Sequence, residues 1–466
     1  MMPFSVPRLV VAGLSGDGGK TLVSLGLGRA FADRGLAVQA FKKGPDYIDP
    51  AWLSAATRSS CRSLDSFLMP DEAIDASVAP AFGADFILVE GNRGLFDGVD
   101  AAGSHSTAEL AKKLKAPVIL VVDTTKMTRT VAAIVLGCRL LDPDLQLAGV
   151  ILNRVGTPRQ ERVIREAVEK AAAIPVLGAI PRLAGADPLP GRHLGLVTFA
   201  EHSAREEAVE RAARAVADAV DLEQVLQIAG RAGDLELSMP VQPLNRHAVT
   251  IGYFKDEIFS FYYPENLAAL EAAGARLVTI SPTVDAALPD QLDALYIGGG
   301  FPEVHAPRLA ENQQFAADLR GKVAAGLPVY AECGGLMYLA RELIVDGASY
   351  PMAGVLDLTI QQEKKPQGHG YEVGTVDRAN PFFETRTELR GHEFHYSHII
   401  AGEDLEHTVV DLERGVGTGN SRDCIVKSNV WASYLHVHAA ATPQWADGLV
   451  DLAAHHAPVR SAAAWA

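Results

Sequence analysis

The chain has 466 residues, 48% of them hydrophobic and 21% charged, which is typical of a globular protein with two or three domains. Its 42 basic and 57 acidic side chains give a net charge of −15, which argues against nucleic acid as a partner, because phosphate binding needs a basic face. No secretory signal or membrane-spanning apolar run stands out, so we expect a cytoplasmic protein with no membrane contact.

Four cysteines lie far apart in the chain and form no CxxC pair. In a protein of this size, such spacing predicts neither a disulfide framework nor a zinc site. We expect mostly buried thiols in a reducing compartment, with room for one reactive exception. The four positions are Cys61, Cys138, Cys333 and Cys424.

The first half of the chain alternates short apolar runs with alanine-rich amphipathic stretches. A strand is predicted over 9–12 and a helix over 20–34. Strands that alternate with helices indicate βαβ units and a parallel sheet. Further strands are predicted over 37–41, 86–90, 118–123 and 149–152.

A glycine-rich turn, VVAGLSGDGGKT over 10–21, joins the first strand to the first helix. Backbone N–H groups in such a turn bind phosphate oxygens, helped by the helix N-terminus. Lys20 would reach the terminal phosphates of ATP, and the Thr21 hydroxyl would ligate Mg²⁺. The match to GxxxxGK[ST] is imperfect, and a turn without a ligand is the alternative. The predicted nucleotide contacts are Gly13, Gly16, Gly18, Gly19, Lys20 and Thr21.

Two later strands end in polar side chains that support a nucleotide site. Glu90 lies at the carboxyl end of its strand, where ligands of open α/β sheets bind, and is a candidate Mg²⁺ ligand. Asn153 ends another strand with an amide suited to a purine edge. Each residue alone is also explained as a helix cap.

The segment FKKGPDYID, over 41–49, places two lysines and two carboxylates after the second strand. Lys42 could neutralise a phosphate or a substrate carboxylate. Asp46 and Asp49 could hold a substrate donor, and Asp46 could also hold the metal. The alternative is a solvated turn, because Gly-Pro-Asp is a turn sequence.

The pattern weakens around 229–248, and a second alternation of strands and helices follows. We therefore expect an α/β protein with two consecutive parallel-sheet domains. The predicted strands are 249–254, 276–281, 294–297, 328–331 and 433–437, with a helix over 264–273. The predicted parts are an ATP-binding domain over 1–235, a linker over 236–248, a second domain over 249–445 and a tail over 446–466.

Cys333 follows a strand and precedes two glycines and a helix-like stretch, an arrangement similar to a nucleophile elbow. A helix N-terminus lowers the pKa of a thiol, so we expect a reactive thiolate. A buried structural cysteine is the alternative, although such cysteines usually have bulky neighbours.

Two histidines at the end of SYLHVH, over 433–438, can supply the base that a cysteine nucleophile needs. On a strand, residues two apart point to one face, so His436 is the candidate base and His438 its neighbour. A zinc pair is the rival, but no further ligands are spaced nearby. The turn at Gly299 and Gly300 could form an oxyanion hole, or could be a plain tight turn.

These motifs resemble known families. The segments 298–303, 331–337 and 433–436 are similar to class I glutamine amidotransferase domains, and the first half resembles the dethiobiotin-synthetase-like, P-loop ATPase fold. Together with 41–50, 90–98 and RGHEFHYS over 390–397, they resemble the cobyrinate a,c-diamide synthase family. That family includes relatives acting on sirohydrochlorin or sirohaem.

The resemblance implies an ATP- and Mg²⁺-dependent ligase that uses L-glutamine to amidate the a and c acetate carboxylates of a tetrapyrrole. One domain would make an acyl phosphate, and the other would release ammonia through a Cys333 thioester. The alternatives are a multi-site amidase of the cobyric acid synthase class and a non-catalytic partition-type ATPase. A homodimer is the default expectation.

Three features depart from the family pattern. His438 stands where many class I enzymes have a glutamate, so the resemblance implies a weak or absent third member beside His436. Gly18 precedes the Gly-Lys-Thr of the loop. Asn92 and Arg93 replace two apolar residues, as in the sirohydrochlorin and sirohaem relatives, so Arg93 is expected to pair with a substrate carboxylate. Asp97, in the same segment, is also expected to face the substrate. Four histidines could face the substrate or fill a domain interface: His369, His392, His395 and His398.

Overall fold

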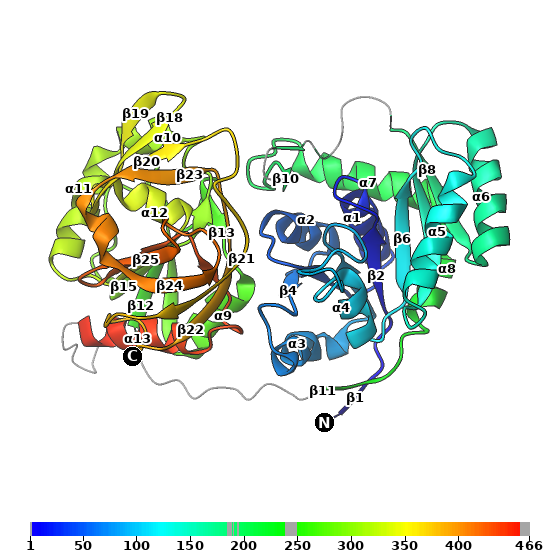
Figure 1. Ribbon diagram of the computed structural model, residues 1–466, viewed down its shortest axis with the longest axis horizontal. Helices are drawn as coiled ribbons and strands as arrows, with labels where there is room; N and C mark the ends of the chain where they lie inside the picture. The colour runs from blue at the N-terminus through cyan, green and yellow to red at the C-terminus, as the bar shows by residue number, and fades with distance from the viewer. Residues whose placement is uncertain (1, 184–188, 190, 193–194, 238–248, 457–466) are drawn as a thin grey trace. The chain divides into compact units, whose positions relative to one another are not determined.

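The computed structural model describes residues 2–183, 189, 191–192, 195–237 and 249–456. The chain divides into two compact units, Met1–Pro240 and Val241–Ala466. Both are α/β units built around a parallel sheet, as the alternating sequence predicts (Figure 1). Within the described ranges, no helix has the length and apolar character needed to cross a bilayer.

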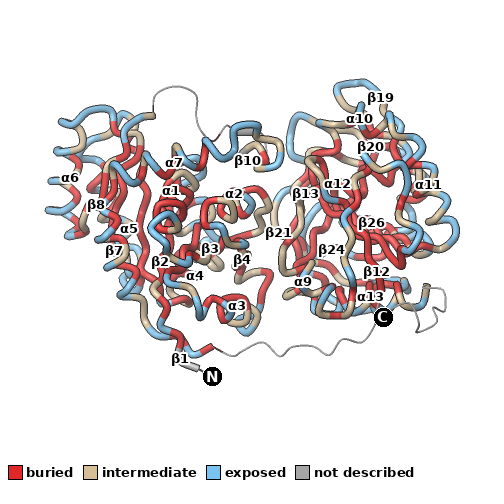
Figure 2. Tube along the Cα trace, turned by 180° about the vertical axis from the view of Figure 1, so that it is seen from behind, coloured by how far each residue is buried: buried red, intermediate tan, exposed pale blue. Residues whose placement is uncertain are grey.

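The sheet of the first unit has seven strands, all parallel, in the order β4-β3-β5-β2-β6-β7-β8. The central strands β2 and β5 are buried along their whole length, which explains why they are continuous apolar runs (Figure 2). The strands are β2 (Arg8–Gly13), β3 (Val38–Lys43), β4 (Arg62–Leu64), β5 (Phe86–Glu90), β6 (Val118–Asp123), β7 (Leu147–Val155) and β8 (Val176–Pro181).

One face of this sheet packs against α1, α7 and α8 through a shared apolar core. Gly26 of α1 permits close packing, since a Cβ there would lie 2.3 Å from Val216 Cγ2 of α7. The helices are α1 (Lys20–Asp33), α2 (Ile48–Thr57), α3 (Asp71–Val78), α4 (Thr107–Lys113), α5 (Thr130–Leu141), α6 (Pro158–Ala172), α7 (Arg205–Ala219) and α8 (Leu222–Ala229), with a 3₁₀ turn, η1 (Ala79–Gly83).

The first unit extends beyond its predicted end. Strand β11 (Leu235–Leu237) pairs antiparallel with β1 (Met2–Phe4), and two short strands, β9 (Gly191–Arg192) and β10 (Gly195–Leu196), form a second pair. Residues 236 and 237, placed in the linker from sequence, therefore belong to β11. The rest of the predicted linker, 238–248, lies outside the described residues.

The second unit has a ten-stranded sheet in the order β14-β12-β15-β17-β26-β25-β24-β21-β22-β27. The first five strands are parallel, and the others join antiparallel, an extension that the sequence pattern does not predict. The strands are β12 (Val249–Phe254), β14 (Ala275–Ile280), β15 (Ala294–Ile297), β17 (Val329–Glu332), β21 (Gly368–Val376), β22 (Glu388–His395), β24 (Thr408–Arg414), β25 (Arg422–Lys427), β26 (Val430–Ser433) and β27 (His436–Val437).

Two smaller sheets complete the second unit. One pairs β13 with β16, and the other has the order β19-β18-β20-β23. Their strands are β13 (Phe259–Phe261), β16 (Gly299–Gly300), β18 (Ala340–Val345), β19 (Ala348–Pro351), β20 (Leu356–Gln362) and β23 (Ser397–Ala401).

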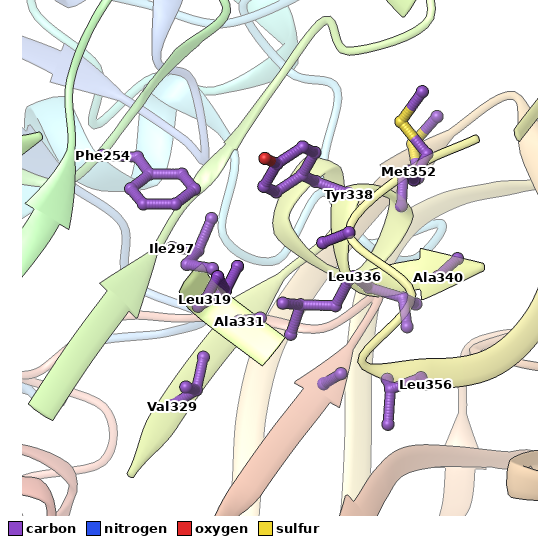
Figure 3. Close-up of a cluster of buried hydrophobic side chains, with 14 of the residues drawn as sticks. Phe254, Ile297, Leu319, Val329, Ala331, Leu336, Tyr338, Ala340, Met352 and Leu356 are labelled. Carbon is purple, nitrogen blue, oxygen red and sulfur yellow. The ribbon is translucent and has the colours of Figure 1, made fainter. Parts of the chain in front are cut away.

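Two apolar clusters form the core of this unit. One contains Leu336 and Tyr338 of α12, packed among the side chains shown in Figure 3. The other contains Trp445 and Leu449 of α13, so the expected tail over 446–466 begins as a packed helix. The helices are α9 (Pro264–Ala272), α10 (Ala306–Glu311), α11 (Gln313–Ala324), α12 (Gly334–Leu339) and α13 (Gln444–His456), with a 3₁₀ turn, η2 (Glu403–His407).

Candidate active site

The phosphate loop leaves β2 at Gly13 and enters α1 at Lys20. Lys20 folds back over Gly13, where a Cβ would lie 2.9 Å from its Cγ, and its Nζ donates to the Ser15 carbonyl at 2.6 Å. Burial, and then the nearby charge of Lys42, lower the pKa of Lys20. The loop is therefore closed around its lysine, as a phosphate cradle requires.

Gly19 has φ +95°, and a Cβ there would lie 2.0 Å from Nδ2 of Asn153. That amide, at the end of β7, donates to the Gly18 carbonyl at 3.1 Å. Asn153 therefore holds the phosphate loop from β7, two strands away from β2 in the sheet, whereas its predicted purine contact remains a prediction.

A pocket of about 300 Å³ opens beside the loop. Asp123, at the carboxyl end of β6, accepts hydrogen bonds from the Thr125 amide at 2.8 Å and from Arg154 at 2.7 Å. These residues were not predicted to belong to the site. Asp123 is nevertheless a carboxylate at the end of a strand, which is the feature that led to the prediction for Glu90. The pocket is lined by Leu14, Ser15, Gly18, Val121, Asp123, Thr125 and Met127.

Residues at the carboxyl ends of three adjacent strands, or just after those ends, bring the Lys42 ammonium together with two carboxylates and a hydroxyl. Lys42 Nζ, at the end of β3, lies 2.6 Å from Asp49 Oδ2 and 2.9 Å from Glu90 Oε1. The Thr21 hydroxyl donates to the same Glu90 oxygen at 2.8 Å. Strands β3, β5 and β2 are neighbours, so their carboxyl ends meet at one edge of the sheet, where open α/β sheets bind ligands.

Burial and mutual contacts control the charges of this cluster. Burial would lower the pKa of Lys42, but Asp49, Glu90 and Asp46 outweigh it and raise that pKa. Burial and then Asp49 raise the pKa of Asp46 to about 7, although its Oδ1 accepts the amides of Ile48 and Asp49. Burial would raise the pKa of Asp49, but the ion pair with Lys42 lowers it.

The predicted Mg²⁺ ligands fit a cation that also takes phosphate oxygens. Burial raises the pKa of Glu90, whose Oε2 is buried and has no hydrogen-bond partner. Across the described residues, no group of three or more His, Cys, Asp or Glu could hold a metal by itself. Mg²⁺ is commonly bound by one or two carboxylates together with nucleotide phosphates, a pattern that Thr21 and Glu90 suit.

The segment after β5 carries two of the four predicted substrate residues, Arg93 and Asp97. Arg93 is exposed and has φ +50°. Asp97 is exposed too, but its Oδ2 accepts the Gly94 amide at 2.8 Å, so it closes a turn. Lys43, the second lysine of the segment 41–49, is buried beside Arg93 and Asp65, and burial lowers its pKa.

Cys333 occupies the turn between β17 and α12 with φ +49° and ψ −97°. A Cβ on Gly334 would lie 2.9 Å from the Gly300 amide nitrogen, and one on Gly335 would lie 2.5 Å from the Ile297 carbonyl. The two glycines therefore let the Cys333 elbow pack directly on the turn with the predicted oxyanion residues, Gly299 and Gly300. Their role stays a prediction.

The protonation state of the Cys333 thiol differs from the reactive thiolate that the sequence predicts. Cys333 is only 6% exposed, and burial, followed by the charge of Glu303, raises its pKa rather than lowering it. Burial therefore outweighs the lowering of the thiol pKa that was expected from the N-terminus of α12. The resting thiol is therefore protonated, and it requires a base.

The predicted strand over 433–437 is broken in two. After Ser433, the amides of Tyr434 and Leu435 donate to Asp423 Oδ2 of β25, at 3.0 and 2.9 Å. The chain then forms β27, in which His436 lies opposite His392 of β22. His438 lies beyond the end of β27, so the premise that His436 and His438 stand on one strand is not met.

His438 caps the turn that follows β27. Its Nδ1 accepts the Ala440 amide at 3.1 Å, and its carbonyl accepts the amides of Ala441 and Thr442. Burial lowers the pKa of His438 to about 4, so it is neutral near pH 7.

His436 has a partner that the sequence analysis did not select. Its Nδ1 lies 3.3 Å from Oε2 of Glu332, the residue before the nucleophile. On the other side of the ring, a Cβ on Gly299 would lie 2.6 Å from Cε1 and 3.3 Å from Nε2. The His392 ring stacks on His436 at 4.9 Å with an 18° interplanar angle. A carboxylate in the otherwise apolar strand β17 was the available signal.

The four histidines predicted to face the substrate or a domain interface differ in burial. His392 and His395 are buried inside the second unit, whereas His369 is exposed and His398 is half-buried. His395 contacts Glu393 at 3.1 Å and stacks on Tyr434 with ring centroids 3.6 Å apart. The buried pair therefore supports the chain segment that carries His436.

Comparison with known proteins identifies both halves. Residues 9–197 match the family described as "CobQ/CobB/MinD/ParA nucleotide binding domain", and residues 250–444 match "CobB/CobQ-like glutamine amidotransferase domain". The matched ranges contain the phosphate loop and the Cys333 elbow, respectively.

Three full-length relatives share one name, cobyrinate a,c-diamide synthase. The protein from Magnetococcus marinus is 42% identical, covering 96% of this chain and 97% of its own length. The protein from Archaeoglobus fulgidus is also 42% identical, covering 94% and 95%. That from Dehalococcoides mccartyi is 39% identical, covering 96% and 98%. The chain belongs to the cobyrinate a,c-diamide synthase family.

Proposed function

We propose that this enzyme uses ATP and L-glutamine to convert the a and c acetate carboxylates of cobyrinate into carboxamides. One observation carries the proposal: a single chain combines the phosphate loop and Lys42–Asp49–Glu90 cluster with a cysteine elbow and a buried histidine that approach the same glycine turn. The substrate follows from the name shared by its relatives.

In the second unit, His436 accepts the proton of the Cys333 thiol, and the sulfur attacks the carboxamide carbon of glutamine. The turn at Gly299 and Gly300 donates backbone N–H groups to the oxyanion of the tetrahedral intermediate. His436 returns the proton to the departing nitrogen as the C–N bond breaks, which releases ammonia. Water then hydrolyses the Cys333 thioester to glutamate.

In the first unit, the phosphate loop and Lys20 hold ATP while a substrate carboxylate attacks its terminal phosphorus. The products are ADP and an acyl phosphate, which ammonia converts to the amide with release of phosphate. Thr21 and Glu90, with Asp46 nearby, would hold Mg²⁺, which neutralises phosphate charge. Asp49 keeps Lys42 at this edge of the sheet, and Arg93 attracts a substrate carboxylate.

The first test separates the two half-reactions. Cys333→Ala should abolish glutamine-driven amidation, because no thioester can form, while added ammonia still supports amidation. Cys138→Ala, a half-buried cysteine in the other unit, is the matched control and should retain glutamine use. A folded Cys333→Ala protein that also fails with ammonia would contradict the two-site scheme.

The second test identifies the substrate. Cobyrinate, sirohydrochlorin and sirohaem would each be offered with ATP and glutamine, and the products weighed by mass spectrometry. Two amides on cobyrinate support the proposal, whereas four indicate the cobyric acid synthase class. Turnover of sirohydrochlorin or sirohaem alone would favour amidation of those macrocycles, the alternative that the Asn92–Arg93 pair supports. Absence of any glutaminase activity would favour a non-catalytic ATPase.

A further inference from the structure

We infer that Glu332 is a positioning residue for glutamine hydrolysis and completes a Cys333–His436–Glu332 relay from the position immediately before the nucleophile. The inference rests on the glutaminase role proposed for Cys333 and His436. It concerns a carboxylate at the end of β17, a strand otherwise made of apolar and aromatic side chains.

The Glu332 carboxylate is fully buried and held in one orientation. Its Oε1 accepts the Val437 amide at 3.2 Å. Its Oε2 lies 3.3 Å from Nδ1 of His436 and accepts the Tyr296 hydroxyl at 3.1 Å. Burial, and then Glu332 itself, raise the pKa of Tyr296, so that phenol remains a donor. A buried carboxylate needs such donors, and three surround this one.

This arrangement selects the tautomer of His436. With Glu332 ionised, Nδ1 must carry the proton that faces it, which leaves the Nε2 lone pair free to accept a proton. The ring edge that contains Nε2 faces Gly299, on the turn that the Cys333 elbow packs against. The edge of the His436 ring that faces this turn therefore carries the nitrogen that can accept a proton from Cys333.

Glu332 also stabilises the charge that forms during the reaction. As the S–H bond of Cys333 breaks and an N–H bond forms at Nε2, His436 becomes an imidazolium. The Glu332 carboxylate pairs with that charge, and the proton next moves to the departing nitrogen of glutamine. No other redox or acid–base reagent is required.

Many class I enzymes have a glutamate two residues after the catalytic histidine, but the residue at that position here, His438, has a different role. His438, two residues after His436, accepts the Ala440 amide with Nδ1 and caps a turn. His392 stacks face to face on His436, and burial, then the charges of His436 and His438, lower the pKa of His392 well below its usual value. His392 is therefore a neutral neighbour, and Glu332 is the anion that contacts His436.

The test compares glutamine hydrolysis by wild type, Glu332→Gln, Glu332→Asp and Tyr296→Phe in the full chain. Glu332→Gln should lower glutaminase kcat/KM by on the order of 10²- to 10⁴-fold, since an amide no longer fixes the tautomer or pairs with the imidazolium. The acid limb of its pH profile should move to lower pH, because protonated His436 has lost its carboxylate partner. Glu332→Asp should recover part of the rate, and Tyr296→Phe should stay within about tenfold of wild type.

A merely structural role would scale the rate without moving the pH profile, and Glu332→Asp would recover nothing. Either result would overturn the inference, as would a Glu332→Gln protein with wild-type glutaminase activity. If Glu332→Gln fails to fold, the profile and rate of Glu332→Asp decide the question instead. Cys333→Ala is measured in parallel: glutaminase activity in that variant would overturn the proposed function, whereas a normal Glu332→Gln enzyme with an inactive Cys333→Ala would overturn only this inference.

Discussion

Individual backbone conformations decide where the two reactive loops can form. Gly19 and Cys333 both have positive φ, at the two positions where a strand turns into a helix. The sequence indicated both loops, because glycines flanking Lys20 and Cys333 are typical of such turns. It did not indicate Glu332 or Asn153 as loop partners, since these contacts join segments that come together only in the folded sheets.

At the residue scale, Gly19→Ala should destabilise the first unit by about 1–3 kcal/mol, the cost of a side chain in a sparsely populated conformation. The added Cβ would also overlap Nδ2 of Asn153, at 2.0 Å. Gly18→Ala is the matched control, because its Cβ would come no closer than 3.7 Å to Ser15 O. Urea unfolding of both variants checks the difference, and equal losses would contradict it.

At the element scale, the alternation of apolar runs predicted both parallel sheets, and several strands match to the residue, including β5, β6, β12 and β15. The break between β26 and β27 was not predictable from local pattern, because it depends on Asp423 of β25 accepting the amides of Tyr434 and Leu435. The antiparallel half of the sheet was missed too, since buried positions of strands such as β21 hold Gly368, Glu372 and Gly374 rather than large apolar side chains.

The burial of Asp423 also predicts a pH dependence of stability. Burial raises the pKa of Asp423 to about 6, and burial followed by Asp423 raises the pKa of Glu372. A raised carboxyl pKa means that the folded state holds its proton more tightly than the unfolded state. The resulting stability, on the order of 3 kcal/mol for Asp423, is complete below about pH 4 and lost as pH rises through 6.

Asp423→Asn removes this titration but keeps an oxygen acceptor for the two amides. Its stability should therefore change less with pH between 4 and 6 than that of wild type. Denaturant unfolding of the second unit at several pH values checks the slope. Glu393, whose pKa is lowered by its contacts with His395 and backbone amides despite burial, is present in both proteins and cancels from the comparison. Identical slopes would show that Asp423 is not the group that titrates.

At the scale of the whole molecule, the proposed function combines two half-reactions in one chain. In the proposed scheme the first unit activates an acid and the second releases ammonia. Among the described residues, the cysteine elbow lies only in the second unit and the phosphate loop only in the first. Ammonium, the form that dominates near neutral pH, is not nucleophilic, so nitrogen lost to solvent is largely wasted. Covalent linkage is useful only if nitrogen moves from one unit to the other before that protonation.

Mixing two single variants tests this coupling. Cys333→Ala retains the first half-reaction and Lys20→Ala retains the second, so an equimolar mixture contains every active group on separate chains. If ammonia is passed within one chain, the mixture should amidate with glutamine at least about tenfold more slowly than wild type, because a linked site sees a far higher effective concentration. An enzyme that consumes free ammonia should stop the mixture while sparing wild type. Equal rates, or equal sensitivity to the scavenger, would mean that ammonia is released to solvent and that the two units need no coordination beyond sharing a chain.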